Sequence, residues 1–532
     1  MKYSEDIRSR VIPFVLLFIF SFSCNSPNTN RSSNVLDIHD EITIDEIQNA
    51  YANDEYTIKE LTHFYLDRIE SLSFEGPELN AVITINPDAM EIAAQLDDEL
   101  RNGNIRGPLH GIPVLLKDNI DTGDKMPCTA GSRAMKESYP PKDSPLAAQL
   151  KMAGAVILGK ANLSEWANFH STTSSSGWSG LGGQTKNPYD LYRNPCGSSS
   201  GSAVAVAANL CVIAIGSETD GSIVCPANNN GIVGIKPTVG LISRSGIIPI
   251  SFSHDTGGPM ARNIKDAAIC LGALTAVDSL DSKTLAPGRI SHKDYTQFLN
   301  PNGIKGKRIG FWKTPLNGYE KVTDVMKETV AFFESQGATI IELDQIIDST
   351  ALDHSYNVML FEFKDGLNKY LRNLGSAVQV RDLEDLIDKT FADSIEMEYH
   401  NHDLFTIAQS KGNLNSEDYQ KSLETMLQLS RAEGIDKIMD VYDLDAIITP
   451  AGGPAWKTDL INGDSFGVYS ASPAAIAGYP NIVVPMGQIN GLPVGLSIFG
   501  RAWSEPLLLE IAYSYEQGTN KRFTPKYIHA EF

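Results

Sequence analysis

The sequence predicts an α/β protein with a mixed, twisted central sheet covered by helices on both faces. Short apolar runs typical of buried strands alternate with amphipathic segments of helical period along most of the 532 residues. The 43 glycines and 27 prolines indicate a turn-rich chain, and neither a heptad register nor a repeat of roughly 20–50 residues is visible. A coiled coil and a solenoid are therefore excluded, and we expect one large domain over residues 42–532.

The first part of this domain carries clear helix-boundary signals. Thr57 and Glu60 form a capping box, after which apolar residues recur at helical spacing. A later helix is expected to begin at Ser144-Pro145, because serine is a common N-cap and proline suits the first helical turn. The elements expected here are helices from residue 58, over 89–100 and over 145–154, and strands at 81–85, 112–116 and 155–158.

The C-terminal part alternates in the same way. Runs rich in β-branched residues predict strands, and Asn490-Gly491 between two such runs is a signal for a β-hairpin. The elements expected are strands at 307–312, 338–343, 446–449, 481–485 and 494–499, with a helix over 323–335.

Residues 345–440 differ from the rest of the domain. They are rich in acidic and long polar side chains at helical spacing, and poor in strand signals. We interpret them as a helical insertion beside the core, with a separable helical domain as the alternative. We expect His400 and His402 of this stretch to lie on an exposed helical face rather than in a metal site.

The N-terminus resembles an export signal. Three basic residues precede an apolar run at 11–20, which is shorter than the roughly 20 residues that span a membrane. Small residues before Cys24 predict a bacterial lipoprotein signal over 1–23, with Cys24 lipidated and 24–41 as a flexible tether. An ordinary cleaved signal and a retained anchor are the alternatives. We accordingly expect an exported protein of the bacterial cell envelope that is lipid-anchored and faces the periplasm.

Charge and cysteine content exclude some partners. Acidic residues outnumber basic ones by 65 to 44, so the net charge is −21, and such a surface repels nucleic-acid backbones. The five cysteines after Cys24 show no CxxC or Cys/His ligand spacing. Cys211 and Cys270 lie in apolar segments typical of buried free thiols, while disulfide formation and the oligomeric state stay open. We expect no nucleic acid, no metal and no cofactor.

Two segments rich in glycine and hydroxyl side chains are the candidates for chemistry. They are Gly197-Ser198-Ser199-Ser200-Gly201 and the stretch 216–222. Glycine beside a hydroxyl allows a tight turn that points N–H groups inward and leaves room for a substrate. The first segment formally matches GxSxG, the nucleophile motif of esterases, but that motif follows a buried strand. A polar, proline-containing stretch precedes it here, so we reject Ser199 as the nucleophile.

Six segments occur in order along the chain: LHGIPVLLKDN at 109–119, GKANLSEW at 159–166, GSS at 197–199, ETDGSI at 218–223, NGIVGIKPT at 230–238 and DTGGPMAR at 255–262. By these segments the sequence resembles the amidase signature family over about residues 42–520. WANF at 166–169 and GIIPISF at 246–252 are further shared segments, and within the family they make the chain most similar to bacterial peptide amidases.

This resemblance implies a Ser–Ser–Lys catalytic triad. Ser222 is implied as the nucleophile, Ser198 as a bridging serine in a cis peptide, and Lys117 as the base. It also implies that the backbone N–H groups of residues 219–222 form the oxyanion hole. The further site residues are Thr219, Asp220, Gly221 and, as a substrate-binding residue, Ser199. Asp220 and Ser200 stand where many members carry glycine, but neither difference removes a catalytic group.

Lys117 can act as a base only when it is neutral. Its ordinary pKa near 10.4 leaves well under about 1% of it neutral at pH 7. The apolar residues 112–116 that precede it disfavour the ammonium and predict a pKa of about 7–8. The alternative is a snorkelling lysine or one that is paired with Asp118.

We therefore expect an amidase that hydrolyses carboxamides through an acyl-enzyme and releases ammonia. The expected substrates are C-terminal amides of short peptides and amino-acid amides. The alternatives are a general aliphatic or aromatic amidase, the glutaminase subunit of a tRNA-dependent amidotransferase, and a non-catalytic binding lipoprotein on the same scaffold. Candidate pocket walls are Gly177-Trp178, Phe252 and Tyr479, and the 345–440 insertion is a candidate cap.

Overall fold

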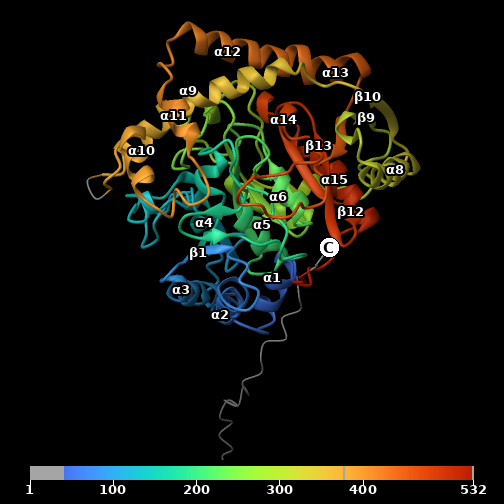
Figure 1. Ribbon diagram of the computed structural model, residues 1–532. Helices are drawn as coiled ribbons and strands as arrows, with labels where there is room; N and C mark the ends of the chain where they lie inside the picture. The colour runs from blue at the N-terminus through green and yellow to red at the C-terminus, as the bar shows by residue number, and fades with distance from the viewer. Residues whose placement is uncertain (1–40, 376–377, 530–532) are drawn as a thin grey trace, which may run out of the picture. The chain divides into compact units, whose positions relative to one another are not determined.

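An 11-stranded mixed sheet forms the centre of the structure, a computed structural model that describes residues 41–375 and 378–529 (Figure 1). β2 pairs in parallel with β3 and β6, as β9 does with β10 and β11, while the other neighbouring strands are antiparallel. The predicted α/β class with a mixed sheet is confirmed. From edge to edge the strands are β1 (Val82–Ile85), β3 (Val156–Ala161), β2 (Pro113–Lys117), β6 (Ile213–Glu218), β8 (Thr256–Ala261), β7 (Val233–Lys236), β12 (Asn481–Ile489), β13 (Leu492–Phe499), β11 (Ala446–Pro450), β9 (Arg308–Trp312) and β10 (Thr339–Leu343).

Helices cover this sheet on both faces. Every residue of β2, β3, β6, β8, β11 and β13 is buried. Successive side chains of a strand point to opposite faces, so such strands must be covered on both sides. The helices are α1 (Ile44–Ala52), α2 (Ile58–Ile69), α3 (Ala89–Arg101), α4 (Pro145–Met152), α5 (Ser200–Ala207), α6 (Val224–Asn229), α7 (Ile264–Leu274), α8 (Glu320–Ser335), α9 (Thr350–Arg372), α10 (Leu383–Ala392), α11 (Asp403–Gln409), α12 (Glu417–Leu427), α13 (Asp436–Tyr442), α14 (Ser472–Ala477) and α15 (Glu505–Thr519).

The helix-boundary signals act as predicted. The capping box at the start of α2 is formed, with Glu60 N donating to Thr57 Oγ1 and Thr57 N donating to Glu60 Oε2. α4 begins after Ser144, whose Oγ accepts from Ala147 N at 3.1 Å. The predicted hairpin joins β12 to β13, and Asn490 at its turn has a φ of 52°. The local sequence therefore fixes these element ends.

The stretch 345–440 is helical and packs directly on the core. It supplies α9 to α13, of which α9, α12 and α13 lie together above α14 in Figure 1. Side chains of α9, α10 and α11 share one buried apolar cluster with Trp166, Phe169, Ile248 and Ile250. A helix of this stretch is thereby held against the loops that form the site described below.

The prediction of an exposed helical face for two histidines is wrong. His400 and His402 are 2% and 0% exposed, and they lie in the segment before α11. They pack on His170 and Trp178 of the core, so their side chains are shielded on both sides. The sequence pattern could not show this, because the residues that cover them are more than 200 positions away.

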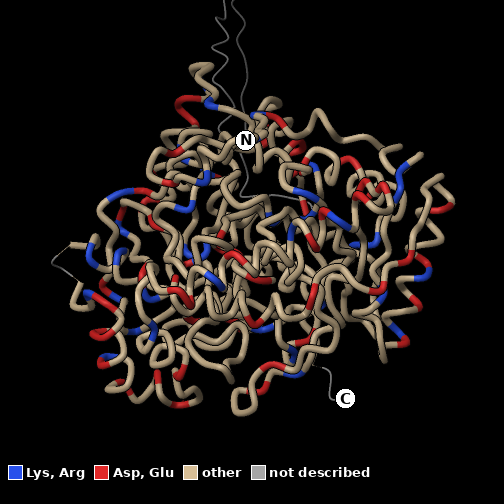
Figure 2. The backbone as a smooth tube through the Cα atoms, turned by 90° about the horizontal axis from the view of Figure 1, so that it is seen from above, with Lys and Arg blue, Asp and Glu red and all other residues tan. Residues whose placement is uncertain are grey.

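The described residues all belong to one compact unit. The predicted signal over 1–23, Cys24 and the tether up to residue 40 lie outside the described residues. Within 41–375 and 378–529, no helix is long and apolar enough to cross a membrane. Figure 2 shows lysine and arginine interspersed with aspartate and glutamate around the periphery, rather than gathered on one face.

Candidate active site

Two parallel strands in the sheet bring the predicted catalytic residues together. Lys117 is the last residue of β2, and residues 219–222 follow the end of its parallel neighbour β6. The carboxyl ends of such strands lie at one edge of the sheet, where ligand sites of open α/β sheets occur. Ser198 reaches the same edge from the loop before α5, and the Gly197–Ser198 peptide bond is cis, as the resemblance implies.

The amine of Lys117 contacts two serines. Its Nζ lies 2.7 Å from Ser198 Oγ, 2.9 Å from Ser217 Oγ and 3.1 Å from the carbonyl oxygen of Ser217. Ser217 Oγ also accepts a hydrogen bond of 2.9 Å from Asn119 Nδ2, which fixes the position of this hydroxyl. Lys117, Ser198 and Ser217 thus form one connected polar group beneath the site.

Burial lowers the pKa of Lys117 to about 7, while the negative charges of Asp255 and Glu218 act in the opposite direction. The side chain is 0% exposed, so the ammonium loses its hydration. None of the ion pairs formed by the described residues includes Lys117. Asp118, the alternative partner considered from the sequence, instead accepts a hydrogen bond from Thr129 Oγ1. The lysine is therefore poised to exchange a proton near neutral pH.

The turn at 219–222 presents backbone donors. Within the described part of the chain, the N–H groups of Asp220, Gly221 and Ser222 make no hydrogen bond, and all three residues line a pocket. Gly221 has a φ of 78°, and a Cβ added there would lie 2.2 Å from Tyr469 Oη. Only glycine fits this position. Unpaired N–H groups beside a serine suit an oxygen that gains negative charge.

Three buried carboxylates accept hydrogen bonds in and beside this turn. Glu218 Oε2 accepts from Ile223 N at 2.7 Å and from Val224 N at 2.9 Å at the start of α6. Asp220 Oδ1 accepts from Tyr469 Oη at 2.9 Å, and Asp255 Oδ1 accepts from Thr219 Oγ1 at 2.6 Å. Burial raises the pKa of both aspartates to about 6 against the effect of these hydrogen bonds.

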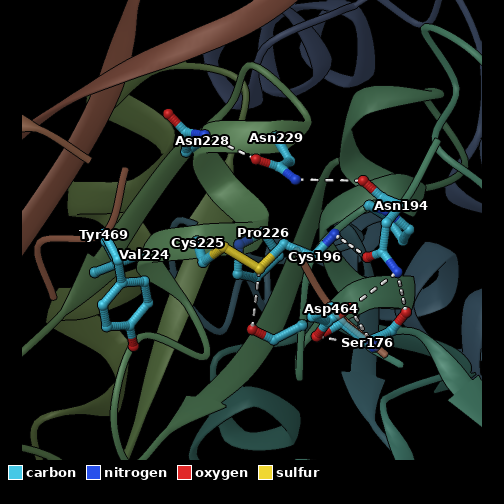
Figure 3. The surroundings of a disulfide bond; sticks show 12 residues. Ser176, Asn194, Cys196, Val224, Cys225, Pro226, Asn228, Asn229, Asp464 and Tyr469 are labelled. Carbon is cyan, nitrogen blue, oxygen red and sulfur yellow. Dashed lines mark hydrogen bonds between the residues drawn. A yellow bond between two sulfur atoms is a disulfide. The ribbon is translucent and has the colours of Figure 1, made fainter. Parts of the chain in front are cut away.

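A disulfide links the loop that carries Ser198 to the start of α6, the helix that follows Ser222 (Figure 3). Cys196 and Cys225 are joined with a Cα–Cα distance of 5.9 Å and a sequence separation of 29. Cys196 stands two residues before Ser198, and Cys225 lies three residues after Ser222. The prediction that Cys211 and Cys270 are buried free thiols is confirmed, and Cys128 is a third.

The pocket beside Ser222 has a volume of about 180 Å³. Met359 of α9 is the contribution of the 345–440 stretch to its wall. The lining residues are Ala167, Asn168, Phe169, Ser176, Cys196, Gly197, Thr219, Asp220, Gly221, Ser222, Cys225, Ile250, Met359, Phe466 and Tyr469.

Some residues expected at this pocket lie elsewhere. Ser199 is buried beneath it, where its Oγ donates to the carbonyl of Ser217 at 3.0 Å, so it positions Ser217. Gly177, Trp178 and Phe252 are absent from the lining, although the nearby Ser176 and Ile250 contribute. Tyr479 belongs to a different apolar cluster, and its hydroxyl donates to Asp436 Oδ2 at 2.7 Å.

Three site residues were missed by sequence reasoning. Asn119 ends the motif that contains Lys117, and Ser217 lies in the stretch 216–222 that contains Ser222, so position within these segments was an available signal. Tyr469 lies almost 250 residues after the turn that it supports, and no local pattern marks it. Long-range partners of this kind depend on the tertiary fold.

Comparison with known proteins adds independent information. The family model for amidase matches residues 60–509. A probable amidase of Arabidopsis thaliana is 40% identical over 95% of this chain and 95% of its own. A glutamyl-tRNA(Gln) amidotransferase subunit from Thermoanaerobacter pseudethanolicus is 34% identical over 92% of this chain and 98% of its own.

Solved structures agree with these matches. The native peptide amidase from Stenotrophomonas maltophilia is 46% identical, with a TM-score of 0.88 over 92% of this chain and 99% of its own. Peptide amidase in complex with the competitive inhibitor chymostatin is 47% identical, with a TM-score of 0.89 over 92% and 99%.

The comparison corrects one prediction. We expected an exported, lipid-anchored protein of a bacterial envelope. Relatives from Arabidopsis thaliana and Schizosaccharomyces pombe, which are not bacteria, match 95% and 92% of this chain. The predicted localisation is therefore wrong.

Proposed function

Since the chain belongs to the amidase family and is a hydrolase of amide bonds, we propose that it cleaves carboxamides through an acyl-enzyme on Ser222. One observation carries the proposal. The amine of the fully buried Lys117 lies 2.7 Å from Ser198 Oγ, next to a turn whose unpaired N–H groups and serine line a pocket.

The surroundings of Lys117 suit the neutral amine. A neutral amine has two N–H groups and one lone pair, whereas an ammonium has three N–H groups. The carbonyl of Ser217 can only accept, and Ser217 Oγ lies at hydrogen-bond distance as a second acceptor. These two contacts use both N–H groups, so the lone pair faces the hydroxyl of Ser198. Lys117 can then take the Ser198 proton.

The proposed acylation forms one C–O bond, breaks one C–N bond and transfers the proton of Ser222 to the departing nitrogen. Lys117 accepts the hydroxyl proton of Ser198, which in turn accepts the proton of Ser222, while Ser222 Oγ bonds to the carboxamide carbon. The carbonyl oxygen becomes negatively charged and receives hydrogen bonds from the N–H groups of the 219–222 turn. Collapse breaks the C–N bond, and the proton returns through Ser198 to the departing nitrogen. Water then hydrolyses the ester on Ser222 by the same route.

The proposed substrate is the C-terminal carboxamide of a short peptide or an amino-acid amide. The support is the similarity to peptide amidase along nearly the whole of both chains. A pocket of about 180 Å³ has room for a small acyl group. A wall on the leaving-group side would admit –NH₂ and exclude a further residue, because a steric clash discriminates strongly. A general aliphatic or aromatic amidase is the alternative.

The nucleophile is tested by covalent labelling. A fluorophosphonate should modify Ser222 alone, detected by mass spectrometry of the digested protein. Ser222→Ala should lose both labelling and amide hydrolysis, whereas Ser200→Ala, which alters a neighbouring buried hydroxyl bonded to the carbonyl of Cys196, should keep labelling. Modification of Ser199, or turnover that survives in Ser222→Ala, would contradict the assignment.

The substrate class is tested by ammonia release. A dipeptide amide, the same dipeptide extended by one residue, L-glutamine and a long-chain fatty amide are compared at equal concentration. We expect release of ammonia from the dipeptide amide and an intact internal peptide bond in the extended peptide. A preference for the fatty amide, for glutamine or for internal cleavage would reject the peptide-amide assignment while leaving the nucleophile unaffected.

A further inference from the structure

A cluster of histidine and glutamate side chains lies behind one wall of the pocket. Glu165 and His170 stand on either side of the segment 166–169, which supplies Ala167, Asn168 and Phe169 to the lining. His402 comes from the segment before α11 and meets them from the other side. One carboxylate oxygen of Glu165 and one imidazole nitrogen each of His170 and His402 all lie within 4.8 Å of one another, and the three residues are at most 1% exposed.

The hydrogen bonding of His402 leaves a lone pair directed into this cluster. Its Nε2 lies 2.8 Å from the carbonyl oxygen of Glu396, which can only accept, so Nε2 carries the proton. In the neutral ring Nδ1 is then an unprotonated acceptor. This nitrogen lies 3.1 Å from Nδ1 of His170, so without an ion it accepts a hydrogen bond from the protonated Nδ1 of His170, and a bound ion would take the place of that proton. A ring whose other nitrogen is held by a carbonyl is the usual arrangement of a metal-binding histidine.

The carboxylate of Glu165 has an unused oxygen. Its Oε2 accepts from Gly180 N at 2.6 Å, whereas Oε1 is buried without a hydrogen-bond partner. None of the ion pairs among the described residues includes Glu165. A buried carboxylate oxygen without a partner costs free energy. Either a bound cation or a shared proton would stabilise this oxygen. The group that would share a proton is the neighbouring Glu396, whose Oε2 is also without a hydrogen-bond partner.

We propose that Glu165, His170 and His402 bind one divalent zinc ion. Two imidazole nitrogens and a carboxylate oxygen are a ligand set that zinc takes at about 2.0–2.1 Å, for which neighbouring ligand atoms of a tetrahedron are about 3.3 Å apart. The His170–His402 nitrogen distance of 3.1 Å is close to that separation. The nearby ring of His400, 5.3 Å from that of His170 between centroids, is the candidate fourth ligand, with water as the other.

The ion has a structural role at this place. Glu165 and His170 belong to the core, and His402 belongs to the 345–440 stretch, so one ion joins both parts. It also fixes the two ends of the segment 166–169. Ala167 and Asn168 of that segment have φ values of 52° and 72°, in the left-handed region that is unfavourable for non-glycine residues. Binding of zinc therefore stabilises one pocket wall without touching Ser222.

The test uses the untagged full chain after dialysis against a chelator. Zinc chloride is titrated into wild type, His402→Gln, Glu165→Gln and the control His63→Gln, and binding is followed by calorimetry and by elemental analysis after gel filtration. His63 is a surface histidine beside Asp67, so its replacement controls for adventitious binding. We expect one zinc per chain in wild type and in the control, and affinity lower by at least about 100-fold in the two site variants.

Cobalt supplies a readout that does not depend on the variants folding. Cobalt added to the metal-free wild type should give visible absorption bands of a tetrahedral site, which zinc then removes. Zinc should also raise the melting temperature of wild type, and magnesium should not. Absence of stoichiometric zinc in wild type, or equal binding in wild type and both site variants, would overturn the proposal and leave a proton shared between Glu165 and Glu396. These readouts are independent of amide hydrolysis, so failure of one proposal does not affect the other.

Discussion

At the level of single residues, the lowered pKa of Lys117 makes turnover depend on pH. The amine accepts a proton only when neutral, and burial places its pKa at about 7. We expect kcat/KM for a peptide amide to rise with pH through an apparent pKa near 7 and then to level off. Lys117→Met, which keeps the volume and removes the base, should lower kcat by at least about 1000-fold. A rising profile that persists in the variant would show that another group is titrating.

Gly221 permits a second residue-level prediction. Gly221→Ala adds a Cβ that would lie 2.2 Å from Tyr469 Oη at a φ of 78°, so the turn must move and Ser222 with it. We expect kcat to fall by at least about 100-fold, as on loss of an oxyanion donor. Gly491→Ala is the matched control, because Gly491 has a φ of 83° but no atom within 4 Å of an added Cβ. The control should lose about 1 kcal/mol of stability and no activity.

Some residues of the site could be predicted from the sequence, and others could not. Lys117, Ser198 and Ser222 lie in short motifs whose glycines and hydroxyls carry a chemical meaning, and the structure brings all three to one edge of the sheet. The roles of Ser217 and Tyr469 arise from packing across strands and across the chain. A sequence pattern contains no distance between such residues, so these contacts could not be derived.

At the level of elements, the Cys196–Cys225 bond joins the loop before α5 to the first turn of α6. A bond that closes a loop of 29 residues restricts the unfolded chain by about 3–4 kcal/mol in the chain-entropy account. Replacing both cysteines by alanine should lower the free energy of unfolding by about this amount, measured in urea. A reducing agent should produce a similar loss in wild type and no further loss in the double variant. Equal stability of wild type with and without the reductant would contradict the prediction.

Strong local signals predicted some elements, although α1, which begins with a capping box of Thr43 and Glu46, was missed. The capping box of Thr57 and Glu60 and the Asn-Gly turn act through neighbouring residues, so α2 and the β12–β13 hairpin could be derived. β8 has the sequence TGGPMA, in which two glycines and a proline lack strand propensity. It is a strand because β6 and β7 enclose it on either side. Tertiary pairing thus overrides the local preference.

At the level of the whole molecule, two buried lysines make stability depend on pH above neutrality. Burial lowers the pKa of Lys117 to about 7 and that of Lys236 to about 8. In the unfolded chain each lysine keeps its proton up to about pH 10.4. Between a lysine's pKa in the folded protein and about pH 10.4, the unfolded state therefore binds more protons, and the free energy of unfolding rises with pH. Buried thiols and carboxyls with raised pKa values act in the opposite direction and offset part of this rise.

We therefore expect the free energy of unfolding to increase by about 1–2 kcal/mol from pH 7.0 to 8.5. Urea unfolding at the two pH values measures it, at constant ionic strength. In Lys117→Met the increase should shrink to less than half, because that variant has lost the larger contribution. A wild-type protein that is less stable at pH 8.5 than at 7.0 would show that the thiols and carboxyls dominate.

The groups that break the amide bond and part of the pocket wall come from different segments of the chain, so mutations can change them separately. The proposed reacting groups and the turn beside them all lie between residues 117 and 222. Ile250, Met359, Phe466 and Tyr469, which complete the wall, come from later segments of the chain. Mutation of Ile250, Met359 or Phe466 can change which amide fits while the bond-breaking groups are inherited intact. New substrates can therefore be acquired in small evolutionary steps, without passing through an inactive ancestor.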